Sequence, residues 1–241
     1  MKQAVISVSG GMDSTGLLLN LLNQDYEKIY ALSFFYGQKH RVELERIAEN
    51  LKYLRTKGID IDHQVIDLSS VMSLFNSALT DPDIDVPEGH YEQENMKLTV
   101  VPNRNAIFSS LVYGYALSIS NKNNCKVDIA LGVHTGDHAV YPDCRPEFYE
   151  AIGIAFKIGN WNSDNVKFYL PYLEGNKFTI LKDARACCDD LNLDFTTIFK
   201  NTNTCYKPNE KGESCGKCGS CTERLEGFEQ LGVTDPVPYV K

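Results

Sequence analysis

The stretch SVSGGMDSTG, residues 7–16, decides the fold because it joins an apolar run to a leucine-rich segment. The run before it predicts a buried strand over 3–9, and the segment after it predicts a short helix over 14–24. Gly10 and Gly11 let the backbone turn sharply and leave its amide groups open to a ligand, and the N-terminus of a helix favours anions. The stretch therefore predicts a phosphate-binding loop.

This loop is not of the Walker form. It lacks the G-x-x-x-x-G-K-[ST] spacing and the lysine of that motif, and Ser9, Ser14 and Thr15 offer hydroxyl groups instead. A simpler interpretation is a glycine turn in which Asp13 or Ser14 caps the following helix.

Strand-like and helix-like segments alternate along the chain. Strands are expected at 29–37, 63–69 and 126–133, and helices at 40–58, 104–120 and 146–159. This alternation predicts an α/β fold with a doubly wound, mostly parallel sheet that is covered by helices on both faces. Ligands of such sheets bind beyond the carboxyl ends of the strands, so functional residues are expected just after strands. The acidic segment 80–97 has little apolar content and predicts a mobile loop or lid.

The composition sets broad limits on function. The chain has 241 residues, of which 43% are hydrophobic, which fits one domain of ordinary size or one domain with a small appendage. Its net charge of −8 makes nucleic acid and anionic membranes unexpected partners. No apolar run approaches the roughly 18 residues of a membrane span, and the N-terminus does not resemble a signal peptide, so a cytoplasmic location is expected.

Four of the eight cysteines lie in a glycine-rich stretch near the C-terminus, at Cys205, Cys215, Cys218 and Cys221. Four thiolates at this spacing can close a tetrahedral site, which is the arrangement of structural zinc. An iron–sulfur cluster is the main competitor, since spacing does not decide the metal, and disulfides are a weaker option in a reducing compartment. The cysteines expected to be plain core residues are Cys125, Cys187 and Cys188.

The glycine loop resembles a known signature. SGGMDS is similar to the SGGxDS motif of the N-type ATP pyrophosphatases, the PP-loop family, whose members adenylate an oxygen and release pyrophosphate. The chain also resembles the 7-cyano-7-deazaguanine synthase family of the queuosine and archaeosine pathway. The resemblance lies in FYGQKH (35–40), VPNRN (101–105), GVHTGDHAVYPDCRPEF (132–148) and the four cysteines, which occur in the family's order. This resemblance runs through the whole chain.

The resemblance implies a complete reaction. A member of this family converts 7-carboxy-7-deazaguanine and ammonia into the nitrile through two rounds of adenylation, each releasing AMP and pyrophosphate. It implies ATP and Mg²⁺ in the active site, one structural Zn²⁺ per chain and a homodimer. It also implies a PP-loop domain over residues 1–200 and a metal-binding segment over residues 201–241.

The resemblance further implies which residues form the site. The residues expected in catalysis are Asp13, Ser14, Arg104, Asp137 and Arg145. The residues expected to bind ATP are Val8, Ser9, Gly10, Gly11, Met12, Asp13, Ser14, Thr15, Gly16, Leu17 and Leu18. The residues expected to bind the deazaguanine are Tyr36, Gln38, His40, Arg104, Asn105, Asp137, Tyr141, Asp143 and Arg145.

One segment departs from the family pattern. An Asn near position 134 and a Ser-Gly pair before Tyr141 are expected, but the chain has His134, His138, Ala139 and Val140. The two histidines are either solvated loop residues or proton carriers in a variant reaction. Three alternatives therefore stay open: a relative that stops at the amide or joins the acyl group to another amine, a PP-loop tRNA thiolase, and a non-enzymatic zinc-binding module.

Overall fold

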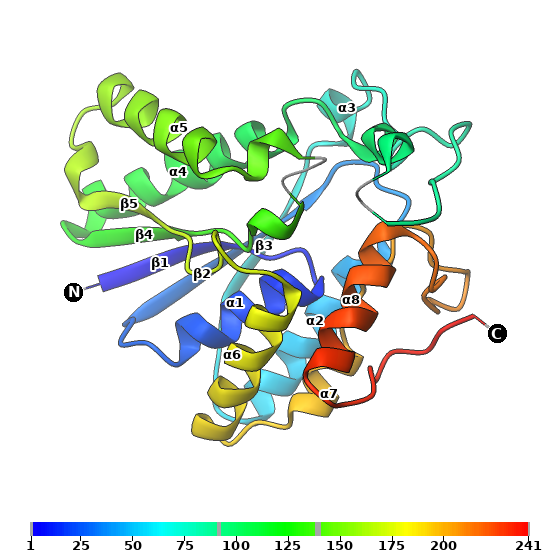
Figure 1. Cartoon of the computed structure of the whole chain (residues 1–241). Coiled ribbons are helices and arrows are strands. Elements are labelled where there is room, and N and C mark those ends of the chain that lie inside the picture. The colour runs from blue at the N-terminus through cyan, green and yellow to red at the C-terminus, as the bar shows by residue number, and fades with distance from the viewer. Residues whose placement is uncertain (1, 91–92, 138–140, 241) are drawn as a thin grey trace.

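The computed structural model describes residues 2–90, 93–137 and 141–240. Strands and helices alternate up to Tyr169, and helices make up the rest of the regular structure (Figure 1). The strands are β1 (Lys2–Ser7), β2 (Lys28–Phe35), β3 (Asp62–Asp67), β4 (Lys126–Ala130) and β5 (Val166–Tyr169). The α-helices are α1 (Met12–Leu22), α2 (Val42–Thr56), α3 (Ser69–Met72), α4 (Arg104–Asn123), α5 (Pro146–Gly159), α6 (Lys177–Asp190), α7 (Phe195–Lys200) and α8 (Gly219–Gln230). Short 3-10 helices span Glu94–Thr99, Thr135–Asp137, Pro142–Cys144 and Ser163–Asn165.

The five strands form one parallel sheet in the order β3-β2-β1-β4-β5. Ala4, Val5 and Ile6 of the central strand β1 are fully buried, as expected for a parallel strand covered on both faces. The chain moves outward from β1 to β3 on one side and from β4 to β5 on the other, so the strand order reverses between β1 and β4. In open α/β sheets, this switch point forms the crevice that receives ligands.

Helices cover both faces of the sheet, which confirms the doubly wound fold (Figure 1). One face carries α4 and α5, and the other carries α1, α2 and α6, with α7 and α8 packed outside them. Helix α1 lies closest to the sheet and buries Leu17, Leu18 and Leu19. Gly16 allows α1 to contact α6 closely, because a Cβ on it would lie 2.5 Å from Cγ2 of Ile180.

The segment 80–97 is joined to its surroundings at several points. Lys39 Nζ donates a hydrogen bond to the carbonyl oxygen of Ile84 at 2.6 Å. The N–H of Gly89 donates to the carbonyl oxygen of Lys217 at 2.8 Å, and this contact ties the segment to the C-terminal region. Its described part therefore borders the cysteine-rich stretch, while its mobility stays a prediction.

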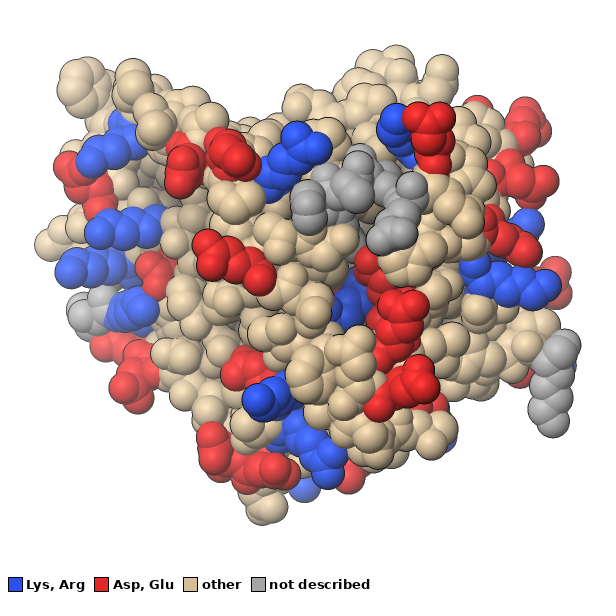
Figure 2. All heavy atoms as spheres, in the orientation of Figure 1, with Lys and Arg blue, Asp and Glu red and all other residues tan. Residues whose placement is uncertain are grey.

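The surface seen in Figure 2 carries Lys and Arg side chains interspersed with Asp and Glu, without a continuous basic area among the described residues of that face. This distribution agrees with the net charge of −8. Of the helices that the structure describes, none combines the length and the apolar character that a membrane crossing requires.

Candidate active site

The glycine loop at the carboxyl end of β1 is shaped by its own hydroxyl groups. Gly10 has a φ of +91°, and a Cβ on it would lie 1.9 Å from the carbonyl oxygen of Glu43, so only glycine fits there. The N–H of Gly11 donates to Ser9 Oγ at 3.0 Å, and the N–H of Ser9 donates to Ser14 Oγ at 3.1 Å. These bonds hold the loop in a tight curve in front of α1.

Helix α1 begins at this loop, and the N–H of its first residue, Met12, donates a long hydrogen bond to Thr204 Oγ1 at 3.4 Å. Gly11 occupies the cap position and its neighbours make no side-chain cap bond, so neither Asp13 nor Ser14 is the ordinary helix cap of the simpler interpretation. A helix N-terminus attracts anions through its partial positive charge and its amide groups. The loop and the first turn of α1 together fit the phosphates of a nucleotide.

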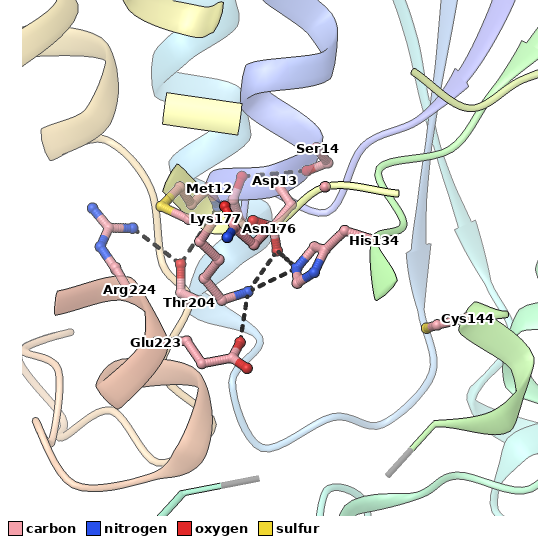
Figure 3. Close-up of polar contacts among 12 residues, drawn as sticks. Met12, Asp13, Ser14, His134, Cys144, Asn176, Lys177, Thr204, Glu223 and Arg224 are labelled. Atoms are coloured by element: carbon pink, nitrogen blue, oxygen red, sulfur yellow. Dashed lines mark hydrogen bonds and ion pairs between the residues drawn. The ribbon is translucent and has the colours of Figure 1, made fainter. Parts of the chain in front are cut away.

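The C-terminal segment supports the loop from behind. The N–H of Asn203 donates to the carbonyl oxygen of Gly10 at 2.9 Å. Arg224, which is almost fully buried, donates to Thr204 Oγ1 at 3.0 Å (Figure 3). It also forms a two-point ion pair with Asp235 at 2.7 and 2.9 Å. A buried guanidinium is stable only when it is paired in this way. The segment that holds the cysteines therefore also positions the phosphate loop.

A buried lysine from α6 lies beside the loop. Lys177 is 4% exposed, and its Nζ lies 3.1 Å from Asp13 Oδ2 and 3.4 Å from Glu223 Oε2 (Figure 3). Nε2 of His134 lies 3.2 Å from the same nitrogen. His134 is only 2% exposed, so for this residue the solvated-loop interpretation is wrong. His138 lies outside the described residues, as do Ala139 and Val140.

The charges of this cluster keep Asp13 ionised. Burial by itself would raise the pKa of Asp13, but the positive charge of Lys177 and the contacts with His134 outweigh it and lower the pKa well below the usual range. Oδ1 of Asp13 is buried and has no hydrogen-bond partner among the described residues. An ionised carboxylate with an open oxygen beside a phosphate cradle fits a magnesium ion.

Sequence reasoning missed Lys177 and Glu223. The only local signal for Lys177 was its position at the first residue of a helix, where a cation opposes the helix dipole. The preceding Asn176 caps that helix by accepting a hydrogen bond from the N–H of Thr179 at 3.0 Å. An unfavourable charge at a well-capped helix start points to a role for that charge elsewhere.

A cavity of about 230 Å³ opens in front of the loop and between the ends of β1 and β4. Its lining brings together many of the residues that the sequence predicts, from both the ATP set and the base set. These are Val8, Ser9, Gly11, Asp13, Ser14, Tyr36, His40, Arg104 and Asn105. The other residues of the ATP set lie in the loop turn or within α1 and do not line the cavity: Gly10, Met12, Thr15, Gly16, Leu17 and Leu18.

The remaining base residues of the sequence prediction lie outside the described lining of the cavity. The amide of Gln38 is used by the loop after β2: its Nε2 donates to the carbonyl oxygen of Phe34, and its Oε1 accepts from the N–H of Tyr36. Tyr141 Oη forms hydrogen bonds with Thr99 Oγ1 at 2.6 Å and with Tyr206 Oη at 3.3 Å, behind the cavity wall.

The last three residues of the predicted base-binding set lie between β4 and the start of α5. Asp137 ends the 3-10 helix Thr135–Asp137, next to residues that the structure does not describe. Asp143 belongs to the 3-10 helix Pro142–Cys144, and its Oδ1 is buried without a hydrogen-bond partner in the described structure. Arg145 is exposed at the start of α5.

Several cavity residues were absent from the sequence prediction. They are Ser7, Phe34, Glu43, Phe108, Ser109, Leu131, Gly132, Val133, His134, Cys144, Tyr149, Asn203, Thr204, Tyr206 and Ser220. Phe34 and Phe108 stack at 4.3 Å between ring centroids, so part of the wall is flat and aromatic. Burial lowers the pKa of His40 to about 3 and raises the pKa of Glu43 to about 8. His40 is therefore a neutral imidazole, and Glu43 is an acid whose charge is poorly compensated.

The four predicted cysteines form a candidate metal centre. The Sγ atoms of Cys205, Cys215, Cys218 and Cys221 all lie within 4.8 Å of one another, and no disulfide joins them. The N–H groups of Lys207 and Cys215 donate to Cys205 Sγ at 3.3 and 3.2 Å, as expected for a sulfur that carries negative charge. This donor set fits a four-coordinate metal ion.

The chain is similar to known proteins over nearly its whole length. A model of the family described as "Queuosine biosynthesis protein QueC" matches residues 3–232. The chain is 46% identical to 7-cyano-7-deazaguanine synthase 1 of Colwellia psychrerythraea over 239 residues, which cover 99% of both chains. It is 47% identical to the 7-cyano-7-deazaguanine synthase of Hahella chejuensis over 98% of this chain and 93% of that protein.

Among solved structures, the U34-tRNA thiolase NcsA from Methanococcus maripaludis with its [4Fe-4S] cluster matches with a TM-score of 0.39 and 16% identity over 95% of this chain and 66% of that one. This likeness is too distant to support a conclusion about the metal or the substrate. The family match, in contrast, spans nearly the whole chain, and the curated relatives share almost half of its residues over their full length. The chain therefore belongs to the QueC family of queuosine biosynthesis proteins.

Proposed function

We propose that this chain converts 7-carboxy-7-deazaguanine, ammonia and ATP into 7-cyano-7-deazaguanine. The observation that carries the proposal is the shared cavity: the phosphate loop with Asp13 lines it, and so do aromatic side chains and Arg104. A planar base and the phosphates of ATP can therefore meet in one space. The name of the curated relatives supports the same reaction.

In the proposed reaction, an oxygen that is a poor leaving group must be removed from the substrate carbon twice. The carboxylate oxygen of the substrate attacks the α-phosphate of ATP, and pyrophosphate leaves. Ammonia then adds to the activated carbon, and AMP departs with the former carboxylate oxygen to give the amide. The amide oxygen attacks a second ATP in the same way, and loss of AMP and of both protons on the nitrogen leaves the nitrile.

The residues of this chain supply positions and charges for these steps. The loop amides and the first turn of α1 receive the phosphates, and Lys177 adds a positive charge beside them. Asp13 is the residue that would hold Mg²⁺, which when bound neutralises charge on the departing pyrophosphate. Arg104 is placed in the cavity wall, where it can hold the substrate carboxylate.

We propose zinc as the ion of the four-cysteine centre. Four thiolates leave no open coordination position, which suits a structural role, and the reaction proposed here requires no electron transfer. Metal analysis of a colourless protein with one zinc per chain would agree with this assignment. Iron with labile sulfide in a brown preparation would overturn it.

We further propose that the chain works in the cytoplasm as a homodimer on small molecules, without a nucleic acid partner. The net charge of −8 supports the last point, because phosphate backbones are repelled. Light scattering of the purified protein, with and without tRNA, tests both the oligomeric state and the absence of RNA binding.

The nucleotide products test the proposed reaction directly. With ATP, ammonium and 7-carboxy-7-deazaguanine, chromatography should show AMP and pyrophosphate, and mass spectrometry should show the nitrile. ADP and phosphate would contradict the assignment of the phosphate loop. An amide or an amine conjugate as product would leave that assignment intact but contradict the nitrile as the product. Asp13→Ala and Ser14→Ala should abolish turnover, while Asp25→Ala, an exposed acid after α1, should leave it unchanged.

A further inference from the structure

Glu43 stands at a fixed distance from the phosphate loop. It lies in the first turn of α2, and its carbonyl oxygen occupies the space that any side chain on Gly10 would need. Helix α2 and the loop are therefore in direct contact, and neither can shift without the other. A ligand that binds to Glu43 therefore has a defined position relative to a nucleotide in the loop.

The carboxyl group of Glu43 belongs to the cavity and is held in one orientation. Glu43 is 7% exposed and lines the cavity together with Asp13, the other acid of its described lining. Its Oε1 accepts a hydrogen bond from Gln38 Nε2 at 3.2 Å and lies 3.7 Å from His40 Nε2. Gln38 is itself fixed by the carbonyl oxygen of Phe34, so the backbone of the loop after β2 holds the acid in place.

This acid has too few hydrogen-bond donors for its charge. The groups that face it are the amide of Gln38, the neutral imidazole of His40 and, at longer range, the guanidinium of Arg104. A buried carboxylate needs two or more donors or a close cation to be stable as an ion. A ligand that brings N–H donors would therefore stabilise Glu43 at the moment it binds.

The walls around Glu43 restrict what such a ligand looks like. Phe34 and Phe108 both line the cavity and stack on each other, and Tyr36 meets Phe108 edge-on at 5.6 Å between centroids. An aromatic wall of this kind favours contact with a planar heterocycle. The two oxygens of a carboxylate match two parallel N–H groups on the edge of a planar ring, in the manner of a bidentate pair.

We propose that Glu43 is the residue that selects the 2-amino-pyrimidinone edge of the base, by accepting hydrogen bonds from the ring N–H and from the exocyclic amino group. This inference rests on the proposed function and adds a specificity-determining residue to it. The sequence prediction includes the acids Asp137 and Asp143 among the residues that bind the deazaguanine, but not Glu43. The opposite side of the base, which carries the reacting carboxylate, then points away from Glu43.

Binding of two ligands to matched variants tests the assignment. The ligands are 7-carboxy-7-deazaguanine and 7-carboxy-7-deazahypoxanthine, which lacks the 2-amino group, titrated calorimetrically in the presence of α,β-methylene-ATP to prevent adenylation. The wild-type chain should prefer the amino ligand by about tenfold or more, the size expected for a hydrogen bond to a charged group. Glu43→Met, which removes both acceptor oxygens, should reduce this preference to about twofold or less while binding α,β-methylene-ATP as the wild type does.

Two further variants keep the test decisive. Glu43→Gln retains the contact with Gln38 and one acceptor, so it should show a smaller but clear loss of preference if Glu43→Met fails to fold. Asp143→Asn tests the rival assignment and should keep the wild-type preference. An unchanged preference in folded Glu43 variants, or its loss in Asp143→Asn alone, would overturn the inference. A wild-type chain that binds both ligands equally would overturn it and leave the proposed function intact, whereas one that binds neither would overturn both.

Discussion

Lys177 is the residue on which the charge balance of the site depends. It neutralises Asp13 and Glu223 at once, and it is buried between them. Lys177→Met should lower the free energy of unfolding by about 3 kcal/mol, because two buried acids then face each other without a cation. Urea unfolding checks the stability, and calorimetric titration with ATP should show a lost or strongly weakened affinity.

The control for this change is Lys182→Met, an exposed lysine of the same helix. It should leave both quantities within experimental error. Equal stability of Lys177→Met and the wild type would mean that the ion pairs contribute nothing to folding.

Sequence reasoning could place Asp13 but not the lysine that pairs with it. Asp13 belongs to a stretch of ten residues whose glycines and hydroxyl side chains form a recognisable pattern, and this local pattern is enough to predict its role. Lys177 lies 164 positions further along the chain and reaches Asp13 only because α6 packs on α1. Pairings of this kind depend on tertiary packing, which no local pattern encodes.

Glu43 should make the stability of the protein depend on pH. Its pKa is about 8 in the folded chain against an ordinary value of 4.5, so between these values the folded state keeps a proton that the unfolded chain has lost. Stability attributable to Glu43 therefore falls as pH rises from about 4.5 to about 8 and is constant above that. Glu43→Gln lacks this loss, so its stability relative to the wild type should rise by about 1 kcal/mol or more over this range.

Thermal unfolding of both proteins at several pH values between 4.5 and 9 measures the difference. Other titrating groups are common to the two chains and largely cancel in the comparison. A difference that stays constant with pH would mean that Glu43 is ionised throughout in the folded protein.

At the scale of elements, α8 connects the cysteine centre to the phosphate loop. It carries Cys221 and, three residues later, Arg224, which donates to Thr204 next to Cys205. Cys218→Ala should therefore lose the metal, lower the melting temperature and weaken ATP binding as well. Metal analysis, thermal unfolding and nucleotide titration give the three readouts.

Cys188→Ala provides the comparison for the cysteine change. Cys188 is buried in α6 outside the cluster, so its loss should cost some packing energy but keep the metal and the ATP affinity. If Cys218→Ala lost its metal and still bound ATP normally, the centre would stabilise the fold without positioning the loop.

The elements that the sequence predicted are those with clear local patterns. The strands that became β1 to β4 and the helices that became α1, α2, α4 and α5 have apolar runs or stripes bounded by Gly or Pro, and the structure confirms them with shifted ends. Strand β5 has only four residues at the sheet edge and gives too short a run to recognise. Helix α6 starts with a buried lysine and mixes acids with buried cysteines. Because some of the residues that it buries against α1 and α8 are polar, its sequence shows no clear apolar stripe.

At the scale of the whole molecule, the site is assembled from seven separated parts of the chain. One cavity is lined by the loop after β1, the loop after β2 with the start of α2, the start of α4, the loop after β4, the start of α5, the stretch around Asn203 and the start of α8. The sequence indicates which segments follow strands, and a parallel sheet places those ends on one edge. Which side chains turn inward depends on how α2, α4 and α8 pack, and this explains why Glu43 and Tyr206 were missed while Tyr36 and Arg104 were found.

The loop and the proposed base pocket share one cavity, and this arrangement determines how many AMP molecules are expected for each nitrile. In the proposed reaction the carboxylate and the amide are adenylated in turn, and the other two described cavities do not border the glycine loop. The amide must then be activated in the same place as the acid. We expect two AMP for each nitrile made from 7-carboxy-7-deazaguanine, and one AMP for each nitrile made from added 7-amido-7-deazaguanine.

Quantifying AMP and nitrile in the same reaction mixtures checks these ratios. Because both rounds use one cradle, Ser14→Ala should abolish the conversion of the acid and of the amide alike. A variant that blocked only one of the two conversions would indicate separate sites for the two adenylations. A ratio of one AMP per nitrile from the acid would contradict the two-round reaction, because a single adenylation activates only one of the two oxygens that must leave.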